Sequence, residues 1–272
     1  MNPVSAVSGR LRRIEGRHNS LVKELRQAFS RGEVTSTGEC AIEGFRIIEE
    51  AVRSGLRLRA VFFSESAEPR APRLLQQINS HVETLLLPDK LFATAVPSQT
   101  PQGVAALVQL KTFTVNEILA STLAGPLLVV AGLQDPGNLG TIIRSAEAFG
   151  TSGVLLSEGT VSAYNPKVVR ASAGSVFRVP IANAKLEPLL AELHERGLRL
   201  IATSSHKGVP LHETDLRGPA AIFVGNEGAG IDKKLLGKMD ELVMIPHSPR
   251  VESLNAGIAA SIILYEAARQ RS

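Results

Sequence analysis

The strongest constraint on the fold is an alternation of short apolar runs with helix-like segments in the second half of the chain. The runs "PLLVVAGL", "GVLLS", "SVFRVPIA", "LRLIATS", "AAIFVG" and "ELVMIP" are apolar over most of their length rather than at every second position. Such runs are typical of parallel strands buried on both faces, with helices as the crossovers between them. Ligands of parallel sheets bind beyond the carboxyl ends of the strands, so the loops there are the first places to search for a site.

A smaller α/β unit is predicted before this sheet. Helical spacing over residues 18–29 and 45–55 alternates with strand-like runs at 59–64, 82–87 and 103–110. The stretch that follows is more polar and ends in Gly-Pro. We therefore predict four parts: a basic N-terminal extension at 1–17, a first domain at 18–110, a linker at 111–125 and a second domain at 126–272.

Composition narrows the setting of the protein. The chain holds a single cysteine, Cys40, which excludes an internal disulfide and favours a reducing compartment. Its first twenty residues lack the apolar core of a secretory signal, and no apolar stretch is long enough to span a membrane. We expect a cytoplasmic protein without a membrane partner.

Basic residues gather near the N-terminus, although the net charge of the chain is only +4. A solvated terminus and an arm that binds a polyanion both fit this pattern. With no tryptophan and 4% aromatic residues, broad stacking on bases is not expected as the main mode of nucleic-acid binding. The residues predicted to bind RNA, including one from the second domain, are Arg10, Arg12, Arg13, Arg17, Lys23 and Arg144.

The first unusual loop is "GLQDPGNLGTIIRSAEAFG", residues 132–150. Asn138 stands where the N-cap of a helix starting near 139 belongs. Arg144 lies off the apolar stripe of that helix, and its side chain leans toward the helix N-terminus, where it can reach an anion. The alternatives are a plain cap and a surface arginine. The loop lacks the glycine patterns of dinucleotide and P-loop sites.

The second loop, "FVGNEGAGI", carries Glu227 between glycines at a strand end. Gly225 and Gly228 would let the backbone approach a ligand closely. The alternative is a cap for a helix that starts near Ile231.

The third loop is "IPHSPRVESLNAG", before the last helix. Ser253 is a natural N-cap for that helix, which is apolar almost all round and so expected to be buried in its domain or in a subunit interface. Asn255 then lies in its first turn, which is costly unless its amide is hydrogen-bonded; completing the cap is the alternative role. The six histidines show no zinc-ligand spacing, and we expect no metal.

At these three loops the sequence resembles the SpoU, or TrmH-like, RNA ribose methyltransferases of the SPOUT superfamily. The matching motifs are "DPGNLGTIIRSAEAFG", "VGNEGAGI" and "IPHSPRVESLNAGIAASIILYE", and they agree with the family in order and spacing over 126–272. The first half is similar to the ribosomal-protein-like α/β substrate-binding domain of this family, including "TPQGVAALV". One departure is His247, where the family often has methionine.

The resemblance implies an α/β fold with a deep trefoil knot in its parallel-sheet domain, which general topology rules would not predict. It implies that S-adenosylmethionine binds in the knot, with Gly225, Ile245 and Leu254 as backbone contacts. It also implies a homodimer through the second domain, with a site that draws on both subunits. The cofactor-binding residues implied are Thr203, Ser204, Ser205, Val224, Gly225, Asn226, Glu227, Met244, Ile245, Pro246, Ser253, Leu254 and Asn255.

The resemblance also implies catalytic roles for Asn138, Arg144, Glu227, Ser253 and Asn255. Arg144 matches the family arginine sometimes proposed as the base. Because arginine stays protonated near neutral pH, we expect it instead to hold the phosphate beside the target ribose. The other four are expected to orient the ribose, the cofactor or the loops around them.

The function implied is methylation of a ribose 2′-hydroxyl of RNA, and the favoured substrate is 23S ribosomal RNA. A transfer-RNA methyltransferase is one alternative, and a non-catalytic RNA-binding factor of ribosome assembly is another. The complete set of motif residues argues against a degenerate site. The target nucleotide, and a housekeeping as opposed to an antibiotic-resistance role, stay open.

Overall fold

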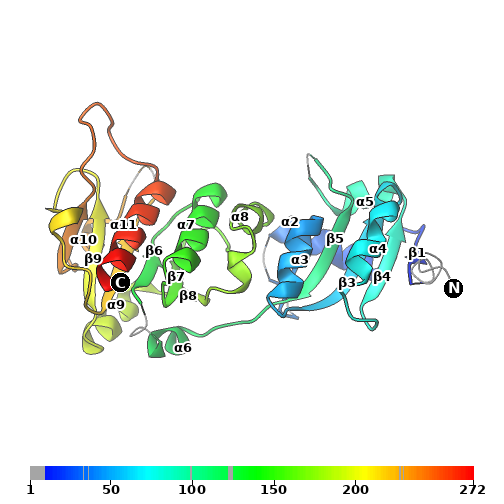
Figure 1. Cartoon of the computed structure of the whole chain (residues 1–272), viewed down its shortest axis with the longest axis horizontal. Helices are drawn as coiled ribbons and strands as arrows, with labels where there is room; N and C mark the ends of the chain where they lie inside the picture. Colours follow the sequence, from blue (N-terminus) through cyan, green and yellow to red (C-terminus); the bar gives the residue numbers. More distant parts are fainter. Residues whose placement is uncertain are drawn as a thin grey trace. The chain divides into compact units, whose positions relative to one another are not determined.

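The computed structural model of this 272-residue chain describes residues 10–32, 34–35, 37–98, 100–121, 125–226, 228 and 230–272. It divides into two compact units (Figure 1). The N-terminal unit comprises Met1–Lys111 with Tyr164–Phe177, and the C-terminal unit comprises Thr112–Ala163 with Arg178–Ser272.

The C-terminal unit is built on a seven-stranded sheet in which every pair of neighbours is parallel, as the apolar runs predict. Its strand order is β10-β12-β9-β11-β6-β7-β8. The strands are β6 (Leu127–Val130), β7 (Gly153–Ser157), β8 (Ile181–Ala184), β9 (Arg199–Ser204), β10 (Val209–Pro210), β11 (Ala220–Val224) and β12 (Glu241–Met244).

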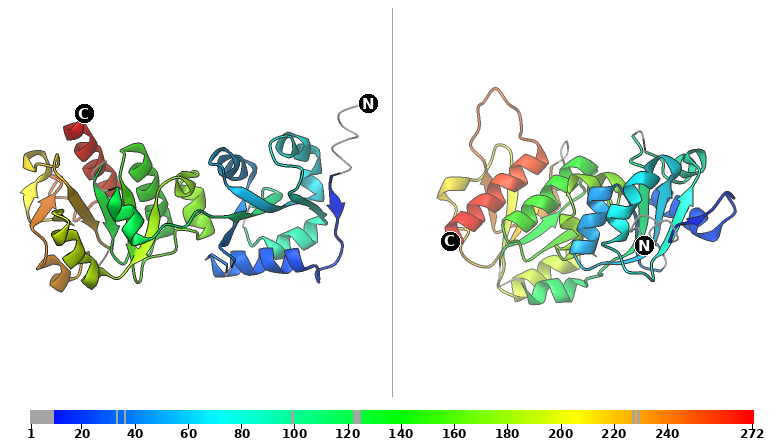
Figure 2. Two further views of the ribbon diagram at one scale, coloured as in Figure 1. Left: turned by 90° about the horizontal axis from the view of Figure 1, so that it is seen from below. Right: turned by 45° about the vertical axis from the view of Figure 1, so that its right-hand side comes forward.

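Helices cover both faces of this sheet (Figures 1 and 2). On one face, apolar residues of α6, α9 and α10 share a buried cluster with Phe223 of the central strand β11. On the other face, α7 and α11 lie side by side. The bounds are α6 (Val115–Ala120), α7 (Pro136–Ala148), α9 (Leu186–Glu195), α10 (Lys233–Leu236) and α11 (Ala256–Arg271).

The N-terminal unit holds a mixed sheet of five strands in the order β1-β4-β3-β5-β2. Strand β5 runs antiparallel to β2 and β3, whereas β4 runs parallel to β3 and β1. The strands are β1 (Arg12–Arg13), β2 (Glu39–Glu43), β3 (Arg57–Ser64), β4 (Glu83–Leu87) and β5 (Val104–Gln109).

Helices cover both faces of the smaller sheet (Figure 2). Helices α2 and α5 share a buried cluster with Phe62 and Leu107, and α3 and α4 lie on the opposite face. Helix α2 begins after Asn19, whose side chain accepts from the Leu21 amide at 3.0 Å. The bounds are α2 (Ser20–Arg31), α3 (Phe45–Arg53), α4 (Ala71–Leu75), α5 (Asp89–Ala95) and α8 (Pro166–Ala171), the last within the inserted segment 164–177.

The structure differs from the sequence-based elements in two places. The run "SVFRVPIA" forms a 3-10 turn at Ser175–Phe177, and the strand begins only at Ile181, because Pro180 has no amide to donate to a ladder. Within the segment expected as a linker, a capping box of Thr114 and Glu117 starts helix α6, whose Ile118 and Leu119 are buried in the C-terminal unit.

Candidate functional site

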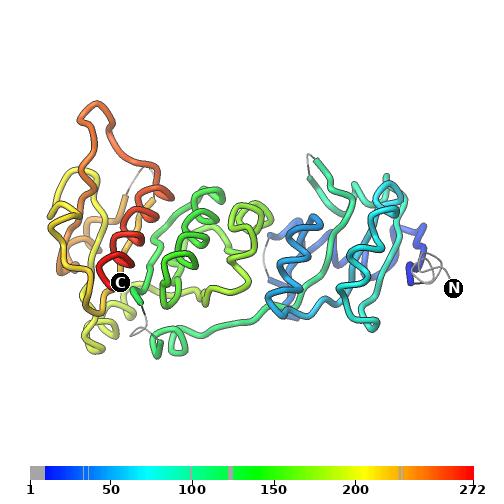
Figure 3. Tube along the Cα trace, viewed as in Figure 1, coloured from blue at the N-terminus to red at the C-terminus, as the bar shows by residue number. Residues whose placement is uncertain are grey.

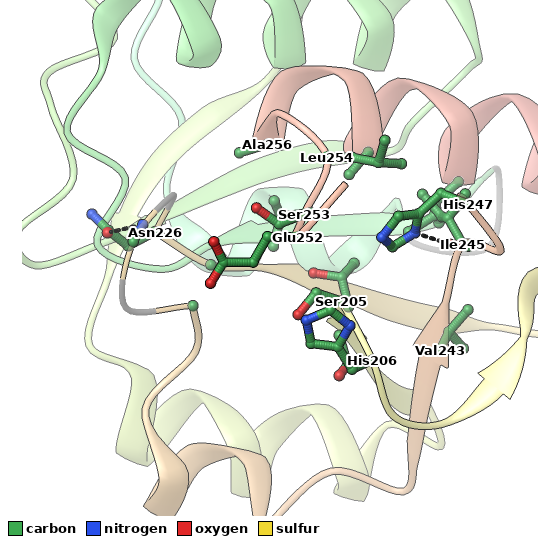
Figure 4. Close-up of a pocket in the computed structure, with 18 residues that line it drawn as sticks. Ser205, His206, Asn226, Val243, Ile245, His247, Glu252, Ser253, Leu254 and Ala256 are labelled. Atoms are coloured by element: carbon green, nitrogen blue, oxygen red, sulfur yellow. Dashed lines mark hydrogen bonds between the residues drawn. The ribbon is translucent and has the colours of Figure 1, made fainter. Parts of the chain in front are cut away.

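A cavity of about 460 Å³ lies at the carboxyl ends of β9, β11 and β12 (Figure 4). This edge is where ligands of parallel sheets bind, and the volume is in the range of small-molecule cofactor sites. The long loop 245–255 between β12 and α11, orange in Figure 3, contributes to its wall. The lining residues are Thr203, Ser204, Ser205, His206, Val224, Gly225, Asn226, Gly228, Gly230, Val243, Ile245, His247, Glu252, Ser253, Leu254, Ala256, Ala259 and Ile263.

Most of the residues that were expected to bind the cofactor do line this cavity, but three do not. Met244, Pro246 and Asn255 are absent from its lining, and Glu227 lies outside the described residues. The residues that the expectation and the lining share are Thr203, Ser204, Ser205, Val224, Gly225, Asn226, Ile245, Ser253 and Leu254.

Two periodicities in the sequence could have refined this set. Along β12 and its extension, Val243 and Ile245 line the cavity, and alternation of side chains along a strand accounts for the absence of the residue between them. In α11, Ala256, Ala259 and Ile263 are spaced by three and four residues, and so share one helix face.

Gly225 is required by the loop itself. A Cβ at this position would lie 2.4 Å from the carbonyl carbon of Gly230 and 2.6 Å from the Ile231 nitrogen. Asn226 and Gly230 form an antiparallel bridge with backbone bonds of 3.0 and 2.9 Å. The glycine therefore lets the loop fold back on itself, and that fold shapes the cavity wall; direct approach to a ligand is a further role that stays a prediction.

Asn226 ties the second loop to the first. Its Nδ2 donates to the carbonyl of Gly132 at 2.9 Å, and its Oδ1 accepts from the Gly228 amide at 2.9 Å. One wall of the cavity is thus fixed to the loop that leads into α7. In this structure the amide of Asn226 supports the loops from within.

The helix caps differ from those expected. Helix α7 starts at Pro136, and Asp135 caps it by accepting from the Asn138 amide at 2.7 Å, so Asn138 lies in the first turn. Proline at the first helical position needs no amide partner, which moves the helix start three residues earlier. For α11 the cap is Asn255, which accepts from the Ile258 amide at 3.2 Å, and not Ser253.

Gly257 brings the first and third loops together. A Cβ there would lie 3.2 Å from Asn255 Oδ1, 3.2 Å from Thr141 Cβ and 3.3 Å from Asn138 Oδ1. The two asparagine oxygens therefore face the same small space where α11 meets α7. Two of the residues expected to be catalytic are neighbours, although more than a hundred residues separate them in the chain.

Arg144 is exposed on α7 and does not line the cavity of its own chain. Among the described residues, none forms an ion pair or hydrogen bond with its guanidinium. The adjacent Ser145 is held by Ser261 of α11, with 2.6 Å between their hydroxyl oxygens. The helix that carries Arg144 is thus anchored, and the arginine head is available for a ligand.

His247 has a defined tautomer. Its Nδ1 lies 2.7 Å from the Ile245 carbonyl oxygen. A carbonyl only accepts, so Nδ1 carries the proton and Nε2 of the neutral ring is an acceptor. Figure 4 shows this bond at the cavity, and the ring of His206 lies 6.3 Å away.

The basic residues of the N-terminal unit are less free than the sequence suggests. Arg10 donates to the carbonyls of Leu75 and Asn79 at 2.7 and 2.9 Å. Arg12 pairs with Glu83 at 3.1 Å, and Arg13 pairs with Glu65. Arg17 and Lys23 are exposed, and no described residue pairs with them.

Other chemistries find no support in the described ranges. No group of three or more histidine, cysteine, aspartate or glutamate residues there can hold a metal. No helix there is long and apolar enough to cross a membrane. Burial raises the pKa of the Cys40 thiol to about 12, so it is not a nucleophile.

Comparison with known proteins connects this geometry to a family. The family model described as "SpoU rRNA Methylase family" matches residues 125–265, and that of an "MRM3-like substrate binding domain" matches 19–106. The chain is 33% identical, over 94% of its length and 98% of the relative's, to 23S rRNA (guanosine(2553)-2'-O)-methyltransferase RlmP of Bacillus subtilis. It is 30% identical, over 89% and 86%, to 23S rRNA (uridine(2479)-2'-O)-methyltransferase of Streptomyces viridochromogenes.

A solved structure extends the match to the fold. The AdoMet-bound rRNA methyltransferase from Sinorhizobium meliloti superposes with a TM-score of 0.82, 27% identity and coverage of 96% of this chain and 98% of that one. The parallel sheet and the smaller N-terminal α/β unit are therefore those expected from the resemblance. The chain belongs to the SpoU rRNA methylase family.

Proposed function

We propose that this protein transfers a methyl group from S-adenosylmethionine to a ribose 2′-hydroxyl of 23S ribosomal RNA. Full-length relatives named as 23S rRNA 2′-O-methyltransferases support the reaction. The observation that carries it in this chain is a cavity of a size suited to the cofactor, lined by the second and third motif loops and by the end of β9. Those two relatives act on guanosine and uridine, so the target base depends on this chain's own residues.

The cavity fits the cofactor in shape and chemistry. The tight return of the loop at Gly225, the half-buried Ser204 and the exposed Ser205 offer backbone and hydroxyl partners, while Leu254 and Ile263 offer apolar surface. This mixture is typical of nucleoside-binding pockets, in which a few polar groups orient a largely apolar contact. We propose that the three loop segments, 203–205, 224–226 and 253–254, hold the cofactor.

The bound cofactor supplies a methyl group on a positively charged sulfur. The chain must orient the ribose hydroxyl and assist the loss of its proton. Arg144 has a planar fork of donors without a described partner, which suits a phosphate oxygen pair next to the ribose. Asn255 uses its oxygen to cap α11, so its amide nitrogen is the group that can donate to the ribose.

We propose that the active protein is a homodimer through α7 and α11. On α11, Ile258 and Tyr265 are 52% and 54% exposed, which is unusual for apolar residues of a helix beside a binding site. The Phe149 ring packs edge-on against Tyr265 at 5.8 Å and extends this surface. Arg144 emerges from α7 outside its own cavity, so a second copy can bring its arginine to the site.

The knot and the RNA-binding unit are also proposals. Strand β12 lies next to the edge of the sheet, whereas α11, which follows it, lies beside α7. The loop 245–255 between them therefore crosses the ends of β9 and β11, and this path favours threading of the chain. Arg17 and Lys23 are the exposed cations of the N-terminal unit best suited to RNA phosphates. We place the reaction in the cytoplasm, with the ribosomal RNA.

A methylation assay tests the proposed function. Purified protein, labelled S-adenosylmethionine and 23S rRNA lacking 2′-O-methyl groups should yield one labelled nucleotide, mapped by its resistance to alkaline hydrolysis. Label in transfer RNA alone would replace the substrate. Cofactor binding without any RNA methylation would instead favour a non-catalytic assembly factor.

A further inference from the structure

Glu252 stands out among the residues that line the cavity. The other described lining residues are apolar side chains, glycines, hydroxyls, one amide and two histidines. Glu252 is therefore the only described lining residue that carries a full charge whenever the histidines are neutral. Its sign is negative, although the protein acts on a polyanion and has an excess of basic residues.

The Glu252 carboxylate has no structural duty in the described part of the chain. No described residue forms an ion pair or hydrogen bond with it, and the residue is exposed. Arg250, two residues earlier, is exposed and does not pair with it either. Figure 4 shows Glu252 beside Ser253 at the cavity, within the loop that leads into α11.

The cofactor carries positive charges with which this carboxylate would pair. S-adenosylmethionine carries a sulfonium and an ammonium against one carboxylate, so it is a cation overall. S-adenosylhomocysteine, the product, loses the sulfonium charge and is neutral overall. A single acid among described lining residues that are otherwise uncharged would attract the substrate form more strongly than the product.

We propose that Glu252 is a cofactor-selecting residue, whose carboxylate provides the counter-charge for the cationic groups of S-adenosylmethionine. The inference rests on the proposed function for the identity of the ligand. Because Glu252 is exposed to water, solvent screens the attraction. We expect its contribution to the binding free energy to be that of an exposed ion pair. That corresponds to about a 1.5- to fivefold change in Kd.

Three ligands separate the possible contacts. S-adenosylmethionine has both cationic groups, S-adenosylhomocysteine has only the ammonium, and 5′-methylthioadenosine has neither. Isothermal titration calorimetry of the full-length protein gives the Kd of each ligand without any RNA. The variant Glu252→Gln removes the charge at nearly constant shape, and Glu252→Asp keeps the charge on a shorter side chain.

Glu187→Gln is the matched control. Glu187 is exposed on α9 and does not line the cavity, so this variant makes the same change in net charge elsewhere in the C-terminal unit. Glu252→Gln should weaken the binding of S-adenosylmethionine about 1.5- to fivefold and leave the Kd of 5′-methylthioadenosine unchanged. Loss of affinity for S-adenosylhomocysteine as well would assign the contact to the ammonium, and its absence would assign it to the sulfonium.

Two outcomes would overturn the proposal. One is an unchanged Kd for S-adenosylmethionine in Glu252→Gln. The other is an equal loss for all three ligands, which would mean that the loop had been disturbed. Raising the salt concentration should weaken S-adenosylmethionine binding in the wild type more than in Glu252→Gln. If the wild-type protein binds the cofactor normally but methylates no RNA, the proposed function fails and this inference is still decided by the binding data.

Discussion

The two units use charged side chains in opposite ways. In the N-terminal unit, three glutamate side chains that are only 5 to 7% exposed are each matched by an arginine. At the site of the C-terminal unit, Glu252 and Arg144 have no partner among the described residues. The matched pairs are Glu39–Arg59 at 2.8 Å, Glu43–Arg170 at 3.2 Å and Glu49–Arg73 at 3.1 Å.

This difference separates charges that hold a fold from charges that await a ligand. A buried carboxylate needs its partner, because an uncompensated charge in the interior is costly. An exposed charge at a cavity costs little while water solvates it, and it gains a partner only on binding. Substitutions in the two groups should therefore have opposite readouts, on stability in one unit and on binding or rate in the other.

The largest effect is expected at Arg144. Arg144→Ala should lower kcat by about two orders of magnitude or more, in the range of a lost catalytic group, because the RNA phosphate loses its bidentate contact. Its midpoint of urea unfolding and its Kd for S-adenosylmethionine should match those of the wild type. Single-turnover methylation with saturating cofactor measures the rate. Near-normal kcat would remove Arg144 from the site.

Gly225→Ala is expected to come next. Its new Cβ would lie 2.4 Å from backbone at Gly230, so the loop must open and the cavity must change shape. At about 1–3 kcal/mol for such overpacking, cofactor affinity should fall by about 5- to 150-fold in calorimetry. Gly218→Ala is the control, because nothing lies within 4 Å of its added Cβ. Equal affinities of the two variants would contradict a shape-determining role for Gly225.

Arg59→Ala tests the other side of the comparison. Arg59 Nε lies 2.8 Å from Glu39 Oε1, although not aligned as a hydrogen bond, and Glu24 is a second partner. Removing the arginine leaves the nearly buried Glu39 carboxylate without its ion-pair partner. We expect a destabilisation of about 1–3 kcal/mol, which is less than for a fully buried pair because Arg59 is partly exposed. Urea unfolding measures it. A change in cofactor Kd without a change in stability would break the division between the units.

The smallest effect is expected at Glu266, a structural acid within the C-terminal unit. Hydrogen bonds from Arg269 and then Gln270 lower the pKa of Glu266 to about 2 from an ordinary 4.5. The depressed pKa means that this carboxylate stabilises the fold above about pH 4.5, and that the contribution disappears as the pH falls toward 2. We expect less than about 1 kcal/mol.

Thermal unfolding of the wild type and of Glu266→Gln between pH 6 and pH 3 measures this contribution. The Tm difference between the two proteins should shrink as the pH falls, and cofactor affinity at neutral pH should not change. A constant difference would show that the carboxylate charge has no part in it. A shrinking Tm difference would show that the C-terminal unit contains structural charges as well as ligand-binding ones. The contrast would then hold within this unit and between the two units.

The sequence predicts the parallel sheet and the edge at which the cavity lies, because both follow from local patterns. Continuous apolar runs mark strands buried on two faces, and glycine and asparagine at three strand ends mark the cavity edge. Short strands escape the same reasoning. Strand β2 has only five residues, flanked by glutamates, and its identity depends on pairing with β5 far along the chain.

The fine assignments at the site depend on contacts between distant segments. The sequence predicts Asn138 and Ser253 as the caps, and only the backbone geometry decides that Asp135 caps α7 and Asn255 caps α11. An acid in a loop is ordinary in a sequence, so the pattern around Ser253 does not single out Glu252. Its position as the one acid among the described lining residues follows only from the way three strand ends are brought together.

The inserted segment 164–177 has a practical consequence for dividing the molecule. The segment lies between β7 and β8 in the sequence but belongs to the N-terminal unit. There Arg170 pairs with Glu43, and a Cβ added at Gly174 would lie 2.7 Å from Glu50 Cβ. A single cut near residue 111 would therefore separate neither unit cleanly. The C-terminal fragment would carry the apolar side chains Val168, Val169 and Phe177 away from the unit in which they are buried. Excision of a soluble N-terminal module would need the segment supplied in trans or grafted by a circular permutation.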